Sequence, residues 1–140
     1  MQQNDIFLPF VGMLLLSFIV WMYMYVRRLH FFYVNRVDPQ DFATRAQVAA
    51  AGPAPIHKPA DNLQNLLELP ILFYALCLYL FVTGQVDPVH LASAWVFLAF
   101  RVIHSAIHCT INRVVLRFIS YAAAAVALWI MVVRVALAQL

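Results

Sequence analysis

The chain has 140 residues, of which 65% are hydrophobic and 11% are charged, whereas a soluble domain carries about 25% charged residues. This composition excludes an ordinary soluble domain, and no run of Lys and Arg with interleaved aromatics indicates a nucleic-acid partner. The length suits a single all-α domain, an integral membrane four-helix bundle with short connections.

The first predicted span covers about residues 6–27, and its uncharged part is long enough to cross the ~30 Å hydrocarbon core. Aromatic residues near its end suit the membrane interface, and Arg27 and Arg28 close it. The one long connection follows, in which residues 42–51 could form a short interfacial helix.

The second predicted span, about residues 61–82, begins with polar side chains. At 3.6 residues per turn, Asp61, Asn65 and Glu68 share one helical face. Asp61 and Gln64 also have the spacing of a capping box, so Asp61 is expected to cap the helix more readily than to act as a ligand or base. Pro70 should kink the span beside Glu68.

The third and fourth predicted spans cover about residues 88–109 and 113–138. The third carries a polar face of Arg101, His104, Ser105 and His108. Asn112 is expected to cap the fourth, and Arg117 and Tyr121, four residues apart, start its inward face.

Depth in the membrane indicates that these faces meet. Glu68 lies roughly 10 Å into its span at 1.5 Å per residue, and Arg101 lies at a similar depth from the same side. We expect the two to pair, because either charge alone would be more expensive in the membrane. The pair could be purely structural, fixing helix register, or could also serve catalysis. The spacing of His104 and His108 permits a metal site with Glu68, but no metal is expected.

Orientation follows from the distribution of Lys and Arg. Basic residues gather at the first and third connections, and only Arg134 lies toward the other side: Arg27, Arg28, Arg36, Arg45, Lys58, Arg113 and Arg117 form the larger group. Both termini are therefore expected to be extracytoplasmic or lumenal, with the polar site facing the cytoplasm.

The chemistry that these residues offer is cationic and hydrogen-bonding. Arg117, helped by Arg101, His104 and His108, could hold an anionic ligand and lower the pKa of a thiol, because a neighbouring cation favours the thiolate. A hydrophobic electrophile dissolved in the lipid could reach such a site between the helices.

The motifs resemble those of the MAPEG family, the membrane-associated proteins in eicosanoid and glutathione metabolism. Asn65-Leu66-Leu67-Glu68 is similar to its Asn-x-x-Glu element. Arg101-Val102-Ile103-His104-Ser105 resembles its Arg-x-x-His-[Ser/Thr] element, and Arg117 and Tyr121 follow at matching distances. Asp38-Pro39-Gln40-Asp41 resembles the turn after the family's first helix.

The resemblance implies a homotrimer with glutathione bound between neighbouring protomers, near the cytoplasmic side. It implies Arg117 as the catalytic, thiolate-stabilising group and Arg101 as a supporting partner. Apart from the resemblance, we expect Asp61 to support the site as well. The implied glutathione contacts are Asn65, Glu68, His104 and Arg117, and we expect His108 and Tyr121 to join this binding set. The family includes glutathione transferases, glutathione peroxidases, eicosanoid isomerases and a non-catalytic lipid-binding member.

Four positions depart from the family pattern. Asp61 and Gln64 stand where basic residues are usual, His108 replaces a Tyr, and Phe118 replaces a hydroxyl residue. Fewer cations imply weaker glutathione binding or another small thiol, although His30, His57 or Lys58 could compensate.

The leading hypothesis is a membrane glutathione transferase or peroxidase that acts on hydrophobic electrophiles or lipid peroxides, with glutathione as co-substrate. One alternative is a lipid- or thiol-binding protein of the same fold without turnover. A second is a proton or ion pathway through Glu68, Arg101, His104 and His108, against which stands the lack of a polar stripe beyond Glu68.

Overall fold

The computed structural model describes residues 2–44, 46–47 and 54–140. Its elements are η1 (Gln3–Ile6), α1 (Phe7–Asn35), η2 (Pro39–Phe42), α3 (Ala54–Leu66), α4 (Leu69–Val82), α5 (Pro88–Cys109) and α6 (Val114–Ala138). The described part of the chain is all-α. The interfacial helix expected over residues 42–51 falls largely on residues 45 and 48–51, outside the described residues.

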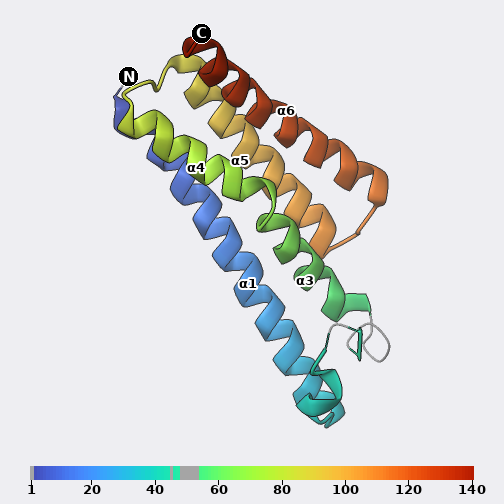
Figure 1. Cartoon of the computed structure of the whole chain (residues 1–140). Coiled ribbons are helices and arrows are strands. Elements are labelled where there is room, and N and C mark those ends of the chain that lie inside the picture. The colour runs from blue at the N-terminus through green and yellow to red at the C-terminus, as the bar shows by residue number, and fades with distance from the viewer. Residues whose placement is uncertain (1, 45, 48–53) are drawn as a thin grey trace.

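Four helical segments in the described part are long and apolar enough to cross a membrane. They cover Gln3–Asn35, His57–Val82, Pro88–Cys109 and Val114–Ala138. Figure 1 shows them as a bundle in which α6 runs along α5, α1 packs against α3 and α5, and both termini lie at the same end. The composition had predicted this four-span, all-α plan.

α1 runs without a break to Asn35, well past the basic pair that was expected to close the span. Arg36 then takes a left-handed conformation with φ 50°, and its N–H donates to the carbonyl of Phe32. This is a common way to end a helix. In Figure 1 the end of α1 consequently extends beyond the neighbouring helices.

The second span consists of two helices, because α3 ends at Leu66 and α4 begins at Leu69. Pro70 lies in the first turn of α4, where its missing N–H is tolerated, and the break falls beside Glu68 as the sequence indicated. The start of the span was wrong. α3 begins at Ala54, so Asp61 lies inside the helix and cannot cap it.

At the opposite end of the bundle, Asp87 joins α5 to α6. Its carboxylate accepts the His90 N–H at 2.8 Å, which caps α5, and forms an ion pair with Arg134 near the end of α6. Partial burial acts to raise the pKa of Asp87, but the His90 N–H and the Arg134 guanidinium outweigh it and hold this pKa below its usual value.

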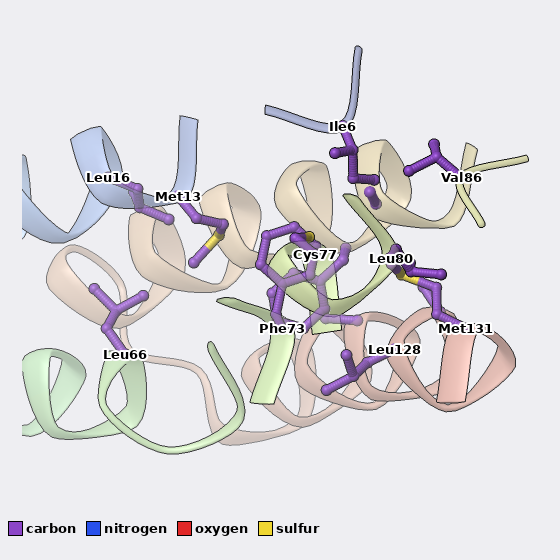
Figure 2. Close-up of a cluster of buried hydrophobic side chains, with 14 of the residues drawn as sticks. Ile6, Met13, Leu16, Leu66, Phe73, Cys77, Leu80, Val86, Leu128 and Met131 are labelled. Atoms are coloured by element: carbon purple, nitrogen blue, oxygen red, sulfur yellow. The ribbon is translucent and has the colours of Figure 1, made fainter. Parts of the chain in front are cut away.

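All four spans contribute side chains to one buried cluster, which Figure 2 shows in close-up. Met13 of α1, Phe73 of α4 and Leu128 of α6 are fully buried in it. The rings of Phe73 and Phe97 stack with centroids 4.5 Å apart. Because lipid is as apolar as these side chains, the cluster holds the bundle mainly by close packing.

Candidate functional site

A cavity of about 200 Å³ opens between α3, α5 and α6, near the α5–α6 connection. Polar groups on its wall are those that the sequence had singled out. The lining residues are Asn65, His104, Val114, Arg117, Phe118 and Tyr121. Three helices thus bring an amide, an imidazole, a guanidinium and a phenol to one place.

Arg101 lies fully buried behind this wall. Its Nη2 donates to the carbonyl oxygen of Asn65 at 2.6 Å, and its guanidinium carbon lies 5.5 Å from the centroid of the Tyr121 ring. The Asn65 carbonyl is one of those that the end of α3 leaves unpaired, and helix C-termini favour a cation. The broken second span therefore supplies a partial negative charge where Arg101 needs one.

The expected ion pair between Glu68 and Arg101 does not form. Glu68 is exposed, and its carboxylate makes no hydrogen bond or ion pair within the described part of the chain. Only a longer-range electrostatic attraction links it to Arg101. The helix break is the reason, because at φ −99° and ψ −99° Glu68 leaves the helical face that a continuous span would have kept.

His104 is held in one tautomer by the backbone of α6. Its Nδ1 lies 3.0 Å from the carbonyl oxygen of Arg117, which can only accept, so Nδ1 carries the proton. Its Nε2 is buried and has no hydrogen-bond partner among the described residues. His104 lines the cavity, and its Nε2 is left as an unused acceptor just inside the cavity wall.

His108 lies one turn farther along α5, outside the cavity lining. Its Nδ1 is 3.4 Å from the Asn65 amide nitrogen, and its ring packs edge-on against His104 with centroids 5.6 Å apart. The structure therefore places His108 behind Asn65 as a support.

Arg117 lies half-buried at the cavity wall. Its Nη1 donates to Oδ1 of Asn112 at 2.7 Å. Asn112 was expected to cap α6, but the cap position belongs to Arg113, and no side chain caps the helix there. This contact could not be predicted from the sequence, because Asn112 and Arg117 are not spaced as neighbours on one helix.

A second asparagine, Asn62, is fully buried and was missed. Its carbonyl accepts from the Ser105 hydroxyl at 3.4 Å, and its amide contacts the Cys109 sulfur at 3.5 Å. Its i, i+3 spacing from Asn65 could have revealed it, had the helix been started before Asp61. Asp61 itself is exposed and does not line the cavity.

Two further observations bound the chemistry. Lys58, considered as a compensating cation, donates to the Thr110 carbonyl at 3.0 Å and so holds the α5–α6 connection. No group of three or more His, Cys, Asp or Glu side chains is placed to hold a metal ion within residues 2–44, 46–47 and 54–140.

Comparison with protein families identifies the family to which this site belongs. The MAPEG family profile matches residues 6–137, which include all but the outermost residues of the four spans and every residue that lines the cavity. The chain belongs to the MAPEG family. Members of this family are membrane glutathione-related enzymes, and this chain is accordingly an integral membrane protein. Neither the curated proteins nor the solved structures that were compared gave a match.

Proposed function

We propose that this protein is a glutathione-using membrane enzyme that conjugates hydrophobic electrophiles or reduces lipid peroxides. The observation that carries the proposal is the Arg117 guanidinium, held at the wall of a cavity beside an unpartnered imidazole nitrogen of His104. A cation next to a bound thiol favours the thiolate, and the thiolate is the nucleophile.

The described residues fit the groups that glutathione carries. Asn65 and His104 offer hydrogen bonds to its peptide backbone, and the exposed, unpaired carboxylate of Glu68 can meet its ammonium group. Behind them, Nε and Nη1 of Arg101 are buried without hydrogen-bond partners among the described residues. His108 and Tyr121 support this set, since His108 contacts Asn65 and the Tyr121 ring lies over Arg101.

The size of the cavity supports a shared site. Ligand pockets usually enclose roughly 300–1,000 Å³, whereas one chain supplies about 200 Å³ here. We infer a homotrimer in which a neighbouring protomer closes the open side. The Lys and Arg distribution further favours a site on the cytoplasmic side, with both termini extracytoplasmic or lumenal.

In the proposed reaction, the thiol proton leaves to solvent and Arg117 stabilises the sulfur anion. With an electrophile, a sulfur–carbon bond forms as the leaving group or a π-bond electron pair is displaced. With a lipid hydroperoxide, the thiolate attacks the terminal oxygen, the O–O bond breaks, and the alkoxide takes a proton to become an alcohol, which leaves glutathione as its sulfenic acid. The thiol of a second glutathione then displaces water from the sulfenic acid to give glutathione disulfide.

The test is the thiolate absorbance of glutathione bound to purified protein. Arg117→Ala should abolish the thiolate band while the trimer persists in size-exclusion chromatography. Arg113→Ala removes a cation four residues away that does not line the cavity, so it should leave the band unchanged. A full thiolate band in Arg117→Ala would reject the proposed role.

A non-catalytic lipid- or thiol-binding protein is the second candidate. The scarcity of free cations favours it, since Asp61 and Gln64 replace the usual basic residues and Lys58 is engaged with Thr110. Glutathione binding in calorimetry without turnover of any electrophile or peroxide would support this candidate over an enzyme.

A further inference from the structure

The α5–α6 connection places a neutral amide against the cation on which the proposed function depends. Asn112 has a left-handed backbone with φ 49°, and its N–H donates to the carbonyl of Ile107 at 2.8 Å. Its side-chain oxygen accepts from Nη1 of Arg117 at 2.7 Å. Asn tolerates this backbone conformation better than most residues, because its short polar side chain bonds locally.

The contact matters because, without it, the Arg117 side chain could turn away from the cavity. A long arginine side chain loses considerable rotamer entropy when it is fixed, and near a membrane surface it tends to extend toward water. Arg117 is only half-buried and close to the start of α6. An acceptor on the connection keeps the guanidinium at the cavity wall.

The chemical type of the acceptor matters as well. A carboxylate at this position would hold the guanidinium and also neutralise it. An amide oxygen accepts one hydrogen bond and leaves the full positive charge available to an anion in the cavity. Meanwhile His104 Nδ1 donates to the Arg117 carbonyl, so the backbone and the side chain of Arg117 are each fixed by a neutral group.

We propose that Asn112 is a positioning residue that holds the Arg117 guanidinium at the cavity without neutralising it. This inference rests on the proposed function, in which Arg117 stabilises a thiolate. It predicts that bound glutathione ionises less readily when Asn112 is changed, whereas the overall fold and the amount of bound glutathione change little.

Two variants separate position from charge. Asn112→Gly suits the left-handed backbone and removes only the side-chain acceptor, and Asn112→Asp keeps an acceptor but adds a negative charge. Arg113→Gln is the matched control, because it lowers the net charge by the same one unit as Asn112→Asp, one residue away, at a side chain that is exposed and lines no part of the cavity.

The measurement is the thiolate band of bound glutathione as a function of pH, with affinity from calorimetry and assembly from size exclusion. Asn112→Asp should raise the pH midpoint by about one unit. Asn112→Gly should lower the thiolate fraction at neutral pH about three- to tenfold, as expected for one lost hydrogen bond. The other groups near the cavity stay the same in all variants: Glu68, Arg101, His104, His108 and Tyr121.

The outcomes distinguish this inference from the proposed function. If wild-type protein forms the thiolate and both Asn112 variants keep its midpoint and fraction, the positioning role is wrong and the proposed function stands. An equal shift in Arg113→Gln and Asn112→Asp would also overturn the role, since it would show a general charge effect. If wild-type protein forms no thiolate with glutathione, both proposals fail.

Discussion

The partner of the buried Arg101 can be tested by comparing two substitutions. In the structure its guanidinium bonds the Asn65 carbonyl and lies over the Tyr121 ring, whereas Glu68 is exposed and makes no ion pair within the described residues. Arg101→Met should therefore destabilise the protein clearly, and Glu68→Gln should not.

The magnitude follows from the contacts that each change removes. A hydrogen bond to a charged group is worth about 1.5–3 kcal/mol, with the low end expected in a membrane, where the unfolded state finds other partners. The contact of Arg101 with the Tyr121 ring adds about 1 kcal/mol, because the guanidinium is buried. Arg101→Met should lower the free energy of unfolding by about 2–3 kcal/mol, and Glu68→Gln by less than about 0.5 kcal/mol.

Equilibrium unfolding in mixed micelles, followed by circular dichroism as the denaturing detergent increases, gives these free energies. The double variant completes a cycle, and the effects of the Glu68 and Arg101 changes should add within about 0.5 kcal/mol. A parallel cycle of Arg101→Met with Tyr121→Leu should show a larger coupling of about 1 kcal/mol. A coupling between Glu68 and Arg101 above about 1 kcal/mol would refute the reasoning, because it would require the direct ion pair that the helix break prevents.

Three further predictions concern other parts of the bundle. Asp87→Asn keeps the cap of α5 but removes the charge that faces Arg134. Folding lowers the pKa of Asp87, so the carboxylate stabilises the protein above its ordinary pKa of about 4. This stabilisation is lost as the pH falls through the lowered pKa. Thermal unfolding should show wild type ahead of this variant at neutral pH and level with it in acid; a gap that persists in acid contradicts the assignment. A Cβ on Gly12 would come 2.6 Å from the end of the Leu98 side chain. Because that end can move aside, Gly12→Ala should be nearly neutral, whereas the larger side chain of Gly12→Leu should destabilise the protein by about 1–3 kcal/mol. Leu98→Ala should restore part of that loss, and no recovery in the double variant would argue against close packing here. Asn62 is fully buried, and Asn62→Leu leaves the Ser105 hydroxyl without its acceptor. The variant should have a lower unfolding temperature, with a cost of about 1–3 kcal/mol. An unchanged temperature would show that the contacts are dispensable.

Much of the plan was predictable because a membrane permits few solutions. Four apolar stretches of sufficient length, separated by turn residues, leave little choice but four helices. Pro70 indicated the break in the second span, and the spacing of Arg117 and Tyr121 correctly placed both on the cavity wall. The family motifs drew attention to the same residues.

The errors at Glu68 and Asp61 both arise in the second span, from its break and from its early start. Periodicity assumes a continuous helix, so it kept Glu68 on the same face as Asn65 and opposite Arg101. The break turned Glu68 outward and exposed a carbonyl that took its place. The early start of α3 likewise moved Asp61 from a cap to an exposed position inside the helix.

The contact between Asn112 and Arg117 lay beyond sequence reasoning for a different reason. It depends on a left-handed backbone in the short connection before α6, and a single asparagine in a turn fits a helix cap equally well. Only the path of the backbone between α5 and α6 decides whether Asn112 caps the helix or contacts Arg117.

The central claim is that the cavity beside Arg117 binds glutathione as its thiolate. The most direct measurement is the number of protons released on binding, obtained by calorimetric titration at neutral pH in buffers of different ionisation enthalpy. Glutathione should release about one proton per occupied site, because its thiol is almost wholly protonated when free, and S-methylglutathione should release none. Equal proton release for the two ligands, or no binding of either, would contradict the account.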